Sequence, residues 1–191
     1  MKTIETSLPD VKLVEPRVFS DERGWFAEVF NQKAFAAAGL PSEFVQDNQS
    51  LSRRGVLRGL HYQLGQQQGK LVRVLAGHIY DVAVDLRRGS PGFGKWVGFH
   101  LTAEKLQMLW IPEGFAHGFL VLSETAQVLY KTTALYYPAG ERCIRWNDST
   151  LKIAWPLEGA DGEIVPSVSA KDDAGAAFED AELPGIESAR I

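Results

Sequence analysis

The chain has 191 residues, a formal net charge of −4 and a pI near 5.6. This charge balance argues against a general nucleic-acid-binding or membrane-surface role, so we expect neither nucleic acid nor a membrane as a partner. With 45% hydrophobic and 23% charged residues, the composition is typical of a globular protein, and the length suits a single domain over residues 1–191.

The N-terminal part of the chain predicts two strands and one helix. Strands are expected at 11–19 and 25–30, on either side of a polar turn over 20–24. Asn31 is a suitable N-cap for a short alanine-rich helix over 32–38. No other segment before the C-terminal part has a convincing helical pattern.

From residue 44 onward, short apolar runs alternate with turns rich in glycine and proline. Many short strands with little helix are typical of a β-sandwich or barrel, and a jelly roll fits best. Beyond Trp155 the sequence is rich in Gly, Ala, Asp and Glu, which predicts a loosely packed peripheral segment. The expected strands lie at 44–50, 56–63, 70–75, 78–86, 96–102, 107–111, 116–122, 126–134 and 142–146.

Charged residues are concentrated in the stretch 56–74, whose two apolar runs and Gly- and Gln-rich loop predict a pair of hydrogen-bonded strands. The stretch carries Arg58, His61, Lys70 and Arg73. Buried charges are costly unless they are paired, so an anionic ligand that also exchanges a proton would explain them. The residues alone therefore indicate a β-sandwich that binds an anionic small molecule.

Histidines are the side chains that titrate nearest neutral pH. The chain has four: His61, His78, His100 and His117. Their spacing contains no metal-binding cluster, so we expect no metal, although His61 and His117 could meet across a sandwich. His61 is the best candidate base, because the nearby Arg58 and Lys70 favour a neutral imidazole that can accept a proton. A carboxylate on its second nitrogen would orient it, and the residues alone do not say which one.

Other polar and aromatic candidates each have an ordinary structural explanation. Tyr130 alternates with apolar residues, and a core tyrosine is favoured over a proton donor. The runs 21–24 and 46–48 are favoured as turns over ligand sites. Tyr136, in an aromatic pair before a proline, could stack on a base or simply end a strand.

The single cysteine, Cys143, can form no internal disulfide, which suits a reducing compartment. An incidental, partly buried thiol is favoured over a nucleophile. We expect neither a signal peptide nor a membrane span, because no basic-then-apolar N-terminal segment and no apolar run of about 18 residues is present. A cytoplasmic protein is therefore expected.

Several longer motifs follow one another along the chain. They are RGLHYQ (58–63), GKLVRV (69–74), DVAVDLRRGSPGFGKWVG (81–98), WIPEGFAHGF (110–119), LYKTT (129–133), RWND (145–148) and SAKD (169–172). In this order they resemble the dTDP-4-dehydrorhamnose 3,5-epimerase family, over most of the chain. The resemblance implies a cupin-type jelly roll with a few short peripheral helices, a homodimer, and catalysis without metal or organic cofactor.

The reaction implied by this resemblance converts dTDP-4-dehydro-6-deoxy-glucose to dTDP-4-dehydro-rhamnose, by epimerisation at C3 and C5, in dTDP-rhamnose biosynthesis. In it His61 would take the proton from carbon, with Asp172 as its carboxylate partner. Tyr130 would return a proton from the opposite face, and Lys70 would lie near the C4 carbonyl. The substrate-binding positions implied by the resemblance are Arg23, Glu28, Gln46, Asp47, Asn48, Arg58, Lys70, His117, Tyr136, Glu141 and Lys171.

One feature of strand geometry has to be reconciled with these roles. Arg58 and His61 are three positions apart, so in a regular strand they would face opposite sides of the sheet. Both can reach one pocket only if the strand contains a bulge or a twist, and Gly59 is the candidate position.

Three alternative functions remain open. One is an epimerase that acts at a single centre, C5 or C3, of a dTDP-4-keto-deoxysugar in another deoxysugar pathway. The second is a cupin that binds a nucleotide sugar without catalysis. The third is a metal-dependent cupin.

Overall fold

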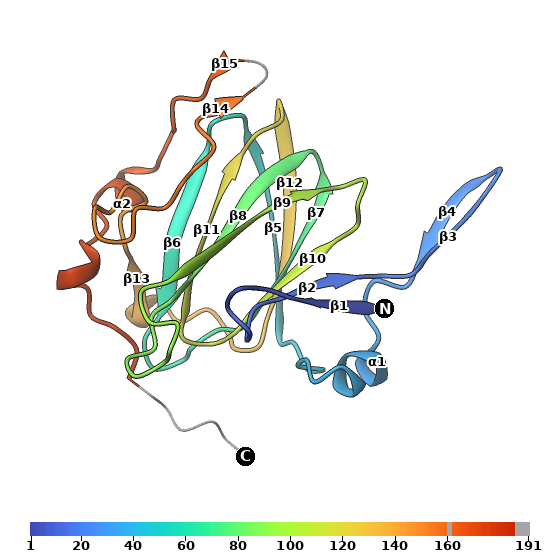
Figure 1. Ribbon diagram of the computed structural model, residues 1–191, viewed down its shortest axis with the longest axis horizontal. Coiled ribbons are helices and arrows are strands. Elements are labelled where there is room, and N and C mark those ends of the chain that lie inside the picture. The colour runs from blue at the N-terminus through green and yellow to red at the C-terminus, as the bar shows by residue number, and fades with distance from the viewer. Residues whose placement is uncertain (160–161, 186–191) are drawn as a thin grey trace.

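The structure, a computed structural model, describes residues 1–159 and 162–185; positions 160–161 and 186–191 of the expected single domain lie outside the described residues. Most strands belong to two antiparallel sheets that face each other (Figure 1). One sheet contains, in order, β1 (Lys2–Glu5), β2 (Lys12–Glu15), β10 (Met108–Ile111), β7 (Lys70–Ala76), β12 (Thr125–Thr132) and β5 (Gln46–Arg53). The other contains β13 (Glu141–Cys143), β6 (Leu57–Gln63), β11 (Phe115–Val121), β8 (His78–Asp85) and β9 (Trp96–Thr102). The all-β prediction is confirmed.

The remaining elements are small and lie outside the two sheets. They are the hairpin of β3 (Val18–Asp21) and β4 (Gly24–Ala27), the two-residue strands β14 (Glu158–Gly159) and β15 (Gly162–Glu163), the helices α1 (Gln32–Ala37) and α2 (Ala170–Asp173), and the 3₁₀ turns η1 (Pro138–Gly140) and η2 (Phe178–Asp180). None of the helices in the described ranges is both long and apolar enough to span a bilayer.

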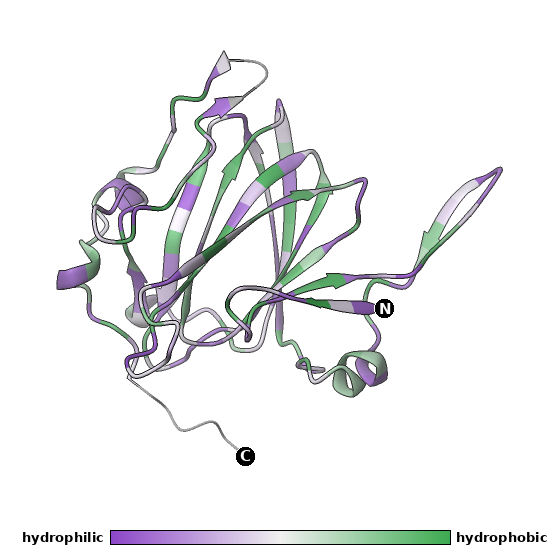
Figure 2. Ribbon diagram, viewed as in Figure 1, coloured by the Kyte–Doolittle hydropathy of each residue, from purple (hydrophilic) through white to green (hydrophobic). Residues whose placement is uncertain are grey.

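The main core fills the space between the two sheets. Val72 and Val74 of β7 and Val128 of β12 meet Ala83 of β8 and Phe119 of β11 there, and all five are buried. Successive side chains of each strand point to opposite faces of its sheet. Green bands and pale or purple bands follow one another along the strands in Figure 2. Alternation buries one face of each strand against the opposite sheet.

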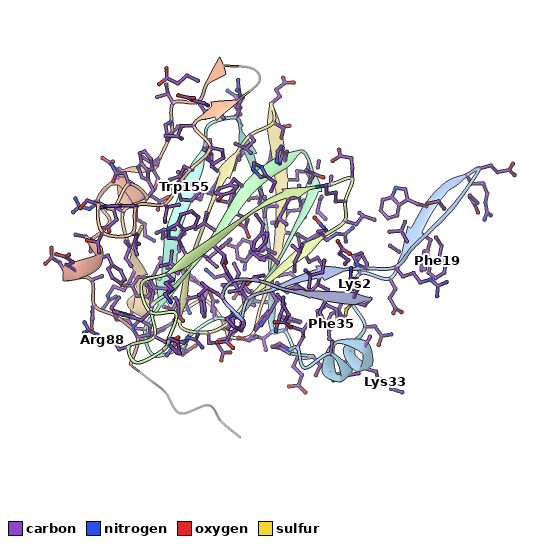
Figure 3. The ribbon with its side chains drawn as sticks, viewed as in Figure 1. Lys2, Phe19, Lys33, Phe35, Arg88 and Trp155 are labelled. Carbon is purple, nitrogen blue, oxygen red and sulfur yellow. The ribbon has the colours of Figure 1, made fainter. Side chains whose placement is uncertain are left out.

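The C-terminal segment is packed more tightly than the sequence predicts. Trp155, Ile164 and Phe178 are buried in a second apolar cluster with Val82 and Val84, on the outer face of the five-stranded sheet. Figure 3 labels Trp155 on this side of the molecule, and Figure 1 shows the segment running past β6 and β13. The prediction of a loosely packed tail is wrong, because apolar residues spaced among the polar ones cover this face.

The stretch 56–74 does not form a pair of neighbouring strands. Its first run is β6, which pairs with β11 and β13, and its second run is β7, which pairs with β10 and β12. The loop between them crosses from one sheet to the other, so the two runs face each other across the interior. The predicted pairing is therefore wrong, but the crossing brings Lys70 opposite His61, and the Lys70 Nζ donates to the His61 carbonyl oxygen at 3.3 Å.

The N-terminal region forms a projecting arm. The expected strand at 11–19 is divided into β2 and β3 at Pro16, which has no N–H to donate to a sheet. Beyond this point β3 and β4 pair as a hairpin that extends away from the sheets, with Phe19 labelled on it in Figure 3. Helix α1 follows as predicted, and the Asn31 side chain caps it by accepting from the Ala34 N–H at 3.1 Å.

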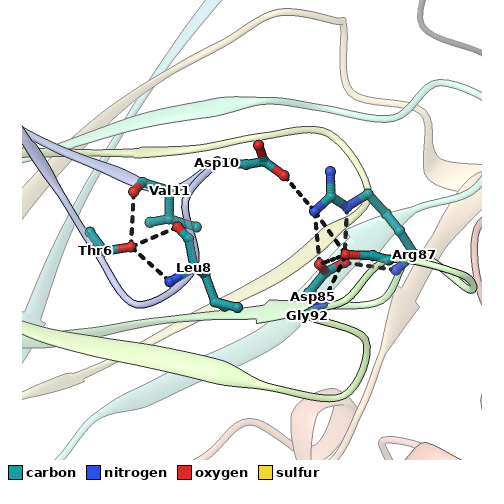
Figure 4. A network of polar contacts seen from close by, with 8 residues as sticks. Thr6, Leu8, Asp10, Val11, Asp85, Arg87 and Gly92 are labelled. Atoms are coloured by element: carbon teal, nitrogen blue, oxygen red, sulfur yellow. Dashed lines mark hydrogen bonds and ion pairs between the residues drawn. The ribbon is translucent and has the colours of Figure 1, made fainter.

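A network of polar contacts fixes the end of β8 to the loop between β1 and β2 (Figure 4). The Arg87 guanidinium donates to Asp85 at 2.7 Å and to Asp10 at 2.8 Å. Ser90 also donates to the Asp85 carboxylate, at 2.6 Å. Since the Asp85 side chain is only 1% exposed, these donors satisfy a carboxylate that burial would otherwise make costly.

Candidate active site

A pocket of about 280 Å³ lies between the two sheets at one end of the sandwich. Side chains from both sheets and from the connections 64–69 and 133–137 line it, and most of them are polar. The lining residues are Gln46, Asn48, His61, Tyr62, Gln63, Gln68, Lys70, Tyr130, Tyr136 and Glu141. The sequence did not single out Tyr62, Gln63 and Gln68, because an uncharged polar residue on a strand or in a loop gives no signal of its own.

A bulge in β6 directs His61 into this pocket. His61 is aligned with His117 on β11, whereas Arg58 is aligned with Phe119, so β6 has one more residue than β11 between these two pairs. Gly59 lies in the bulge with a φ of +113°. A bulge reverses the alternation of side chains beyond it. The expectation of a bulge at Gly59 is confirmed.

His61 is hydrogen-bonded to a buried carboxylate from the C-terminal segment. Its Nε2 lies 2.6 Å from Asp172 Oδ1, and Asp172 is 4% exposed. Ser169 caps α2 by accepting from the Asp172 N–H at 3.1 Å, and Asp172 Oδ2 accepts from the Gly59 N–H at 3.4 Å. Although burial acts to raise the pKa of Asp172, the hydrogen bond and electrostatic interaction with His61 and the hydrogen bonds from Gly59 and Ser169 lower it overall. Asp172 is therefore an ionised acceptor that holds the hydrogen on His61 Nε2 and leaves Nδ1 with its lone pair.

Tyr130 enters the same pocket from the opposite sheet. It lies on β12 between Asn48 of β5 and Val72 of β7, while His61 is on β6. Burial raises the pKa of the Tyr130 phenol; the Arg58 charge acts to lower it and the Glu141 charge to raise it, with a net rise. The phenol therefore keeps its proton at neutral pH. As expected from the sequence, His61 and Tyr130 line a common cavity.

Lys70 is a buried lysine that lines the pocket. Burial lowers its pKa to about 8, against the attraction of Asp81 and Glu141, which acts to raise it. Asp81 in turn lies 2.7 Å from His117 Nε2, and both are buried. Burial lowers the pKa of His117 despite this carboxylate, so His117 is a neutral donor to Asp81.

Asp81 is a site residue that the sequence analysis did not identify. Its signal was present, because the alternation of β8 places Asp81 on the same face as Ala83, which lies in the core between the sheets. A carboxylate on a core-facing position needs a partner. His117 and Lys70 are those partners, although Asp81 Oδ2 has no hydrogen-bond partner among the described residues.

A cluster of charged and aromatic side chains forms the rim of the pocket. The Tyr136 hydroxyl donates to Glu141 Oε2 at 2.5 Å, and Lys171 forms an ion pair with the same carboxylate. Gln46 accepts from the Tyr136 N–H at 2.9 Å and donates to Asn48 at 2.8 Å. These five residues, all expected at the substrate, thus belong to one connected group.

Comparison with known proteins identifies the family. The model of the family described as dTDP-4-dehydrorhamnose 3,5-epimerase matches residues 5–180. The chain belongs to this family. A dTDP-4-dehydrorhamnose 3,5-epimerase from Pseudomonas aeruginosa is 60% identical over 183 residues, which cover 95% of this chain and 98% of that protein.

Solved structures of epimerases have the same fold. A dTDP-6-deoxy-D-glucose-3,5-epimerase from Legionella pneumophila, in complex with dTDP-4-keto-L-rhamnose, has a TM-score of 0.91 and 46% identity, covering 98% of this chain and 99% of that one. A 3'-monoepimerase from Streptomyces bikiniensis, in complex with dTDP-quinovose, has a TM-score of 0.85 and 34% identity, covering 95% and 92%. The cupin-type jelly roll and the isomerase class expected from the sequence are confirmed.

Six of the expected substrate-binding residues of this epimerase are not among the side chains that line the pocket. Two of them, His117 and Lys171, contact Asp81 and Glu141 as described above, and the other four are Arg23, Glu28, Asp47 and Arg58. Asp47 points to the opposite face of β5 from Gln46, where it binds Lys131 at 2.8 Å. Arg23 lies on the projecting arm and binds Asp21, and Glu28 follows the arm and accepts from Asn31. Arg58 lies beside the pocket, close enough for its charge to act on Tyr130, and donates to Ser52 Oγ at 3.1 Å.

One group of described residues could hold a metal ion. A ring nitrogen of His61, the Cys143 sulfur and an Asp172 carboxylate oxygen all lie within 4.8 Å of one another. The histidine spacings in the sequence gave no hint of it, because the three residues come from three separate elements.

Proposed function

We propose that this chain epimerises C3 and C5 of dTDP-4-dehydro-6-deoxy-glucose to give dTDP-4-dehydro-rhamnose, with His61 as the base and Tyr130 as the acid. The observation that carries the proposal is that these two side chains enter one pocket from opposite sheets. Removal of a proton on one face of a carbon and its return on the other inverts that centre, which needs a base and an acid on opposite sides of the sugar.

The ketone at C4 makes this proton transfer possible. Its neighbours C3 and C5 each carry a hydrogen that becomes acidic because the electron pair left behind spreads into the carbonyl as an enolate. A cation near the carbonyl oxygen stabilises the negative charge where it develops. Lys70, which is buried near the negative charges of Asp81 and Glu141, is the proposed cation.

His61 is prepared for its role by Asp172. The hydrogen bond to Asp172 keeps the hydrogen on Nε2, so Nδ1 has a lone pair to accept the proton from carbon. The imidazolium that forms is then stabilised by the buried carboxylate. Both proton carriers are side chains, and the proposed reaction therefore uses no metal or organic cofactor.

The remaining expected residues are proposed to bind the nucleotide sugar. The rim group of Tyr136, Glu141, Lys171, Gln46 and Asn48 surrounds the pocket entrance. Arginine and lysine suit the diphosphate because they form charge-assisted hydrogen bonds with phosphate oxygens. Arg58, which lies beside the pocket, is proposed to bind the diphosphate in this way. His117 is proposed to contact the sugar through its ring, since Asp81 occupies its Nε2.

We also propose that the epimerase is a homodimer, and that its location is cytoplasmic. The projecting arm exposes large apolar side chains, with Phe26 67% and Trp25 58% exposed, next to Phe19 and Val18. Exposed apolar patches of this kind are typical of protein interfaces. A partner subunit that covers the arm would also give Arg23 and Glu28 a pocket to reach. For the location, the support is Cys143, a free thiol that suits a reducing compartment.

A single-centre epimerase is the second candidate, and the 34% identical 3'-monoepimerase is the observation that favours it. Reaction in D₂O separates the two. Deuterium at both C3 and C5 of the recovered 4-keto sugar supports the proposal, whereas deuterium at one carbon overturns it in favour of the second candidate.

The same assay tests the residue roles. His61→Ala is expected to abolish deuterium incorporation while it still binds dTDP, because the base is lost and the rim group remains. Tyr130→Phe is expected to exchange the proton that His61 removes without completing the inversion. If His61→Ala exchanges at the wild-type rate, His61 is not the base.

A further inference from the structure

Cys143 lies beside the His61–Asp172 pair but takes no part in the proposed proton transfers. It is aligned with His61 across β13 and β6. The next aligned residues, Leu60 and Ile144, exchange two backbone hydrogen bonds of 3.0 Å each. His61 and Cys143 therefore form a non-hydrogen-bonded pair, the kind whose side chains approach most closely in an antiparallel sheet.

The three side chains offer ligands that suit zinc. A ring nitrogen of His61, Cys143 Sγ and an Asp172 oxygen lie within 4.8 Å of one another, and the His61 Nε2 to Asp172 Oδ1 distance is 2.6 Å. Zn²⁺ takes nitrogen, sulfur and oxygen ligands whose atoms are roughly 3.5 Å apart in a tetrahedral site. Small side-chain rotations would bring these atoms to that spacing. Three protein ligands leave a fourth position for water.

We propose that Zn²⁺, or another thiophilic divalent cation, binds between His61, Cys143 and Asp172 and switches the epimerase off. The inhibitory effect rests on the proposed function of His61. When the metal binds Nε2, the ring hydrogen moves to Nδ1, and the thiol proton of Cys143 is released to solvent. His61 then has no lone pair facing the substrate, so it cannot accept a proton from carbon.

Hard cations are excluded by the same chemistry. One of the three ligand atoms is the sulfur of Cys143, which a thiophilic cation binds with loss of the thiol proton. Mg²⁺ and Ca²⁺ prefer oxygen ligands and do not displace thiol protons. Inhibition is therefore expected from Zn²⁺ and not from Mg²⁺.

The wild type and the Cys143→Ser variant, compared in inhibition and in spectroscopy, test the inference. Zn²⁺ is expected to inhibit the wild type at a concentration at least about tenfold lower than it inhibits Cys143→Ser, reversibly with EDTA. Because both enzymes meet the same substrate and metal, any Zn²⁺ bound to the diphosphate affects them equally. Equal inhibition of the two enzymes overturns the site.

Binding is measured separately from turnover. Co²⁺ is expected to give the wild type a thiolate-to-cobalt absorption band that Cys143→Ser lacks. In addition, Zn²⁺ is expected to slow alkylation of Cys143, which is the only thiol in the chain. This measurement needs the wild type alone, so it gives a result even if Cys143→Ser does not fold. No band and no protection overturns the metal site. A band with undiminished deuterium exchange keeps the site but overturns its inhibitory effect, while the role of His61 as base is decided separately by His61→Ala.

Discussion

Gly59 lies so close to the backbone of His117 that no side chain fits between them. A Cβ on Gly59 would lie 2.5 Å from the His117 carbonyl oxygen and 2.6 Å from the Gly118 Cα. The φ of Gly59, +113°, is also one that residues with a Cβ rarely adopt. The bulge that turns His61 into the pocket therefore depends on a glycine at this position.

Replacement of Gly59 by alanine is expected to lower the free energy of unfolding by about 3 kcal/mol or more, because it adds a collision with the β11 backbone to an unfavourable φ. It should also lower kcat, since β11 or the bulge must move and His61 moves with it. Chemical denaturation and steady-state kinetics measure the two effects.

Gly39→Ala is the matched control for Gly59→Ala. Gly39 also has a positive φ, +69°, but a Cβ there meets nothing within 4 Å. We expect a cost of about 1–2 kcal/mol from the backbone alone, with kcat unchanged. If the two variants lose the same stability and both keep full activity, the close approach to His117 is not what shapes the site.

The strand pattern of the sequence identifies local structure well. The bulge at Gly59 follows from the three-residue spacing of Arg58 and His61 once the family resemblance assigns both residues to one pocket. The Asn31 cap follows from residue type and position. Both features depend on neighbours in sequence. This is why they are visible without the fold.

Features that depend on which sheet a strand joins cannot be predicted from neighbouring residues in the sequence. The pairing of β6 with β11, rather than with β7, is decided by contacts between residues far apart in sequence, such as His61 and His117, which are 56 positions apart. The burial of Phe178 and Ile164 in the tail likewise needs the outer face of the five-stranded sheet to exist first. The hydrogen bond of Asp172 to His61 spans 111 positions, so only the family resemblance pointed to it.

Asp172→Asn is expected to lower kcat by about 10²–10⁴-fold with little change in KM, because the amide can accept the hydrogen bond from His61 but does not stabilise the imidazolium. Single-turnover kinetics with the 4-keto substrate measure this. The neighbouring and exposed Asp173 provides the control, and Asp173→Asn should retain wild-type kcat. A normal kcat for Asp172→Asn would remove the carboxylate from the mechanism.

Activity is expected to fall as the pH rises through about 8, because Lys70 loses its proton there and the enolate loses its cation. Asp81 of β8 and Glu141 of β13 act to keep the proton on Lys70, while burial lowers the pKa of the neighbouring His117 of β11, which is therefore neutral in this range. Tyr130 titrates above its usual value of 10 and does not contribute to this limb.

The pH profile of kcat/KM checks the assignment of Lys70. Asp81→Asn removes a negative charge that favours the protonated amine, so the alkaline limb should move to lower pH. A limb near pH 8 that stays in place in Asp81→Asn would assign it to another group.

Asp85 is expected to stabilise the fold at neutral pH and to lose that effect in acid. Although burial acts to raise its pKa, the donors Arg87 and Ser90 lower it overall. A carboxylate whose pKa is lower in the folded state than in the unfolded state stabilises the folded state at pH values above its unfolded pKa of about 4. This stabilisation is lost as the pH falls through the pKa of the folded state. Asp85→Asn should therefore cost about 1–3 kcal/mol near neutral pH, and less as the pH drops below about 4.

Denaturation with urea at several pH values measures this difference. Asp10 offers a control, because it binds the same Arg87 from an exposed position. Asp10→Asn should cost no more than about 1 kcal/mol at any pH. A cost for Asp85→Asn that is constant down to acidic pH would contradict the depressed pKa.

The arm is expected to hold together the two subunits of the proposed homodimer. Trp25→Ser with Phe26→Ser removes its two most exposed aromatic side chains and should convert the dimer to a monomer in sedimentation experiments. Val165→Ser, which replaces an apolar residue 77% exposed elsewhere on the surface, should leave the dimer intact. A monomeric wild type, or a dimer that survives loss of both aromatic residues, would contradict this role.

Mixed dimers decide whether the arm also completes the partner's pocket. Suppose that Arg23 binds substrate in the pocket of the other subunit. Both pockets of an Arg23→Ala homodimer then lack the arginine, and both pockets of a His61→Ala homodimer lack the histidine, so both homodimers are impaired. A mixed dimer has one pocket that carries both changes and one that carries neither. Mixing the two inactive or weakened enzymes should then restore up to about a quarter of wild-type activity, because half of randomly formed dimers are mixed and half of their pockets are intact. If Arg23 instead serves its own subunit, every pocket carries one defect, and mixing restores nothing.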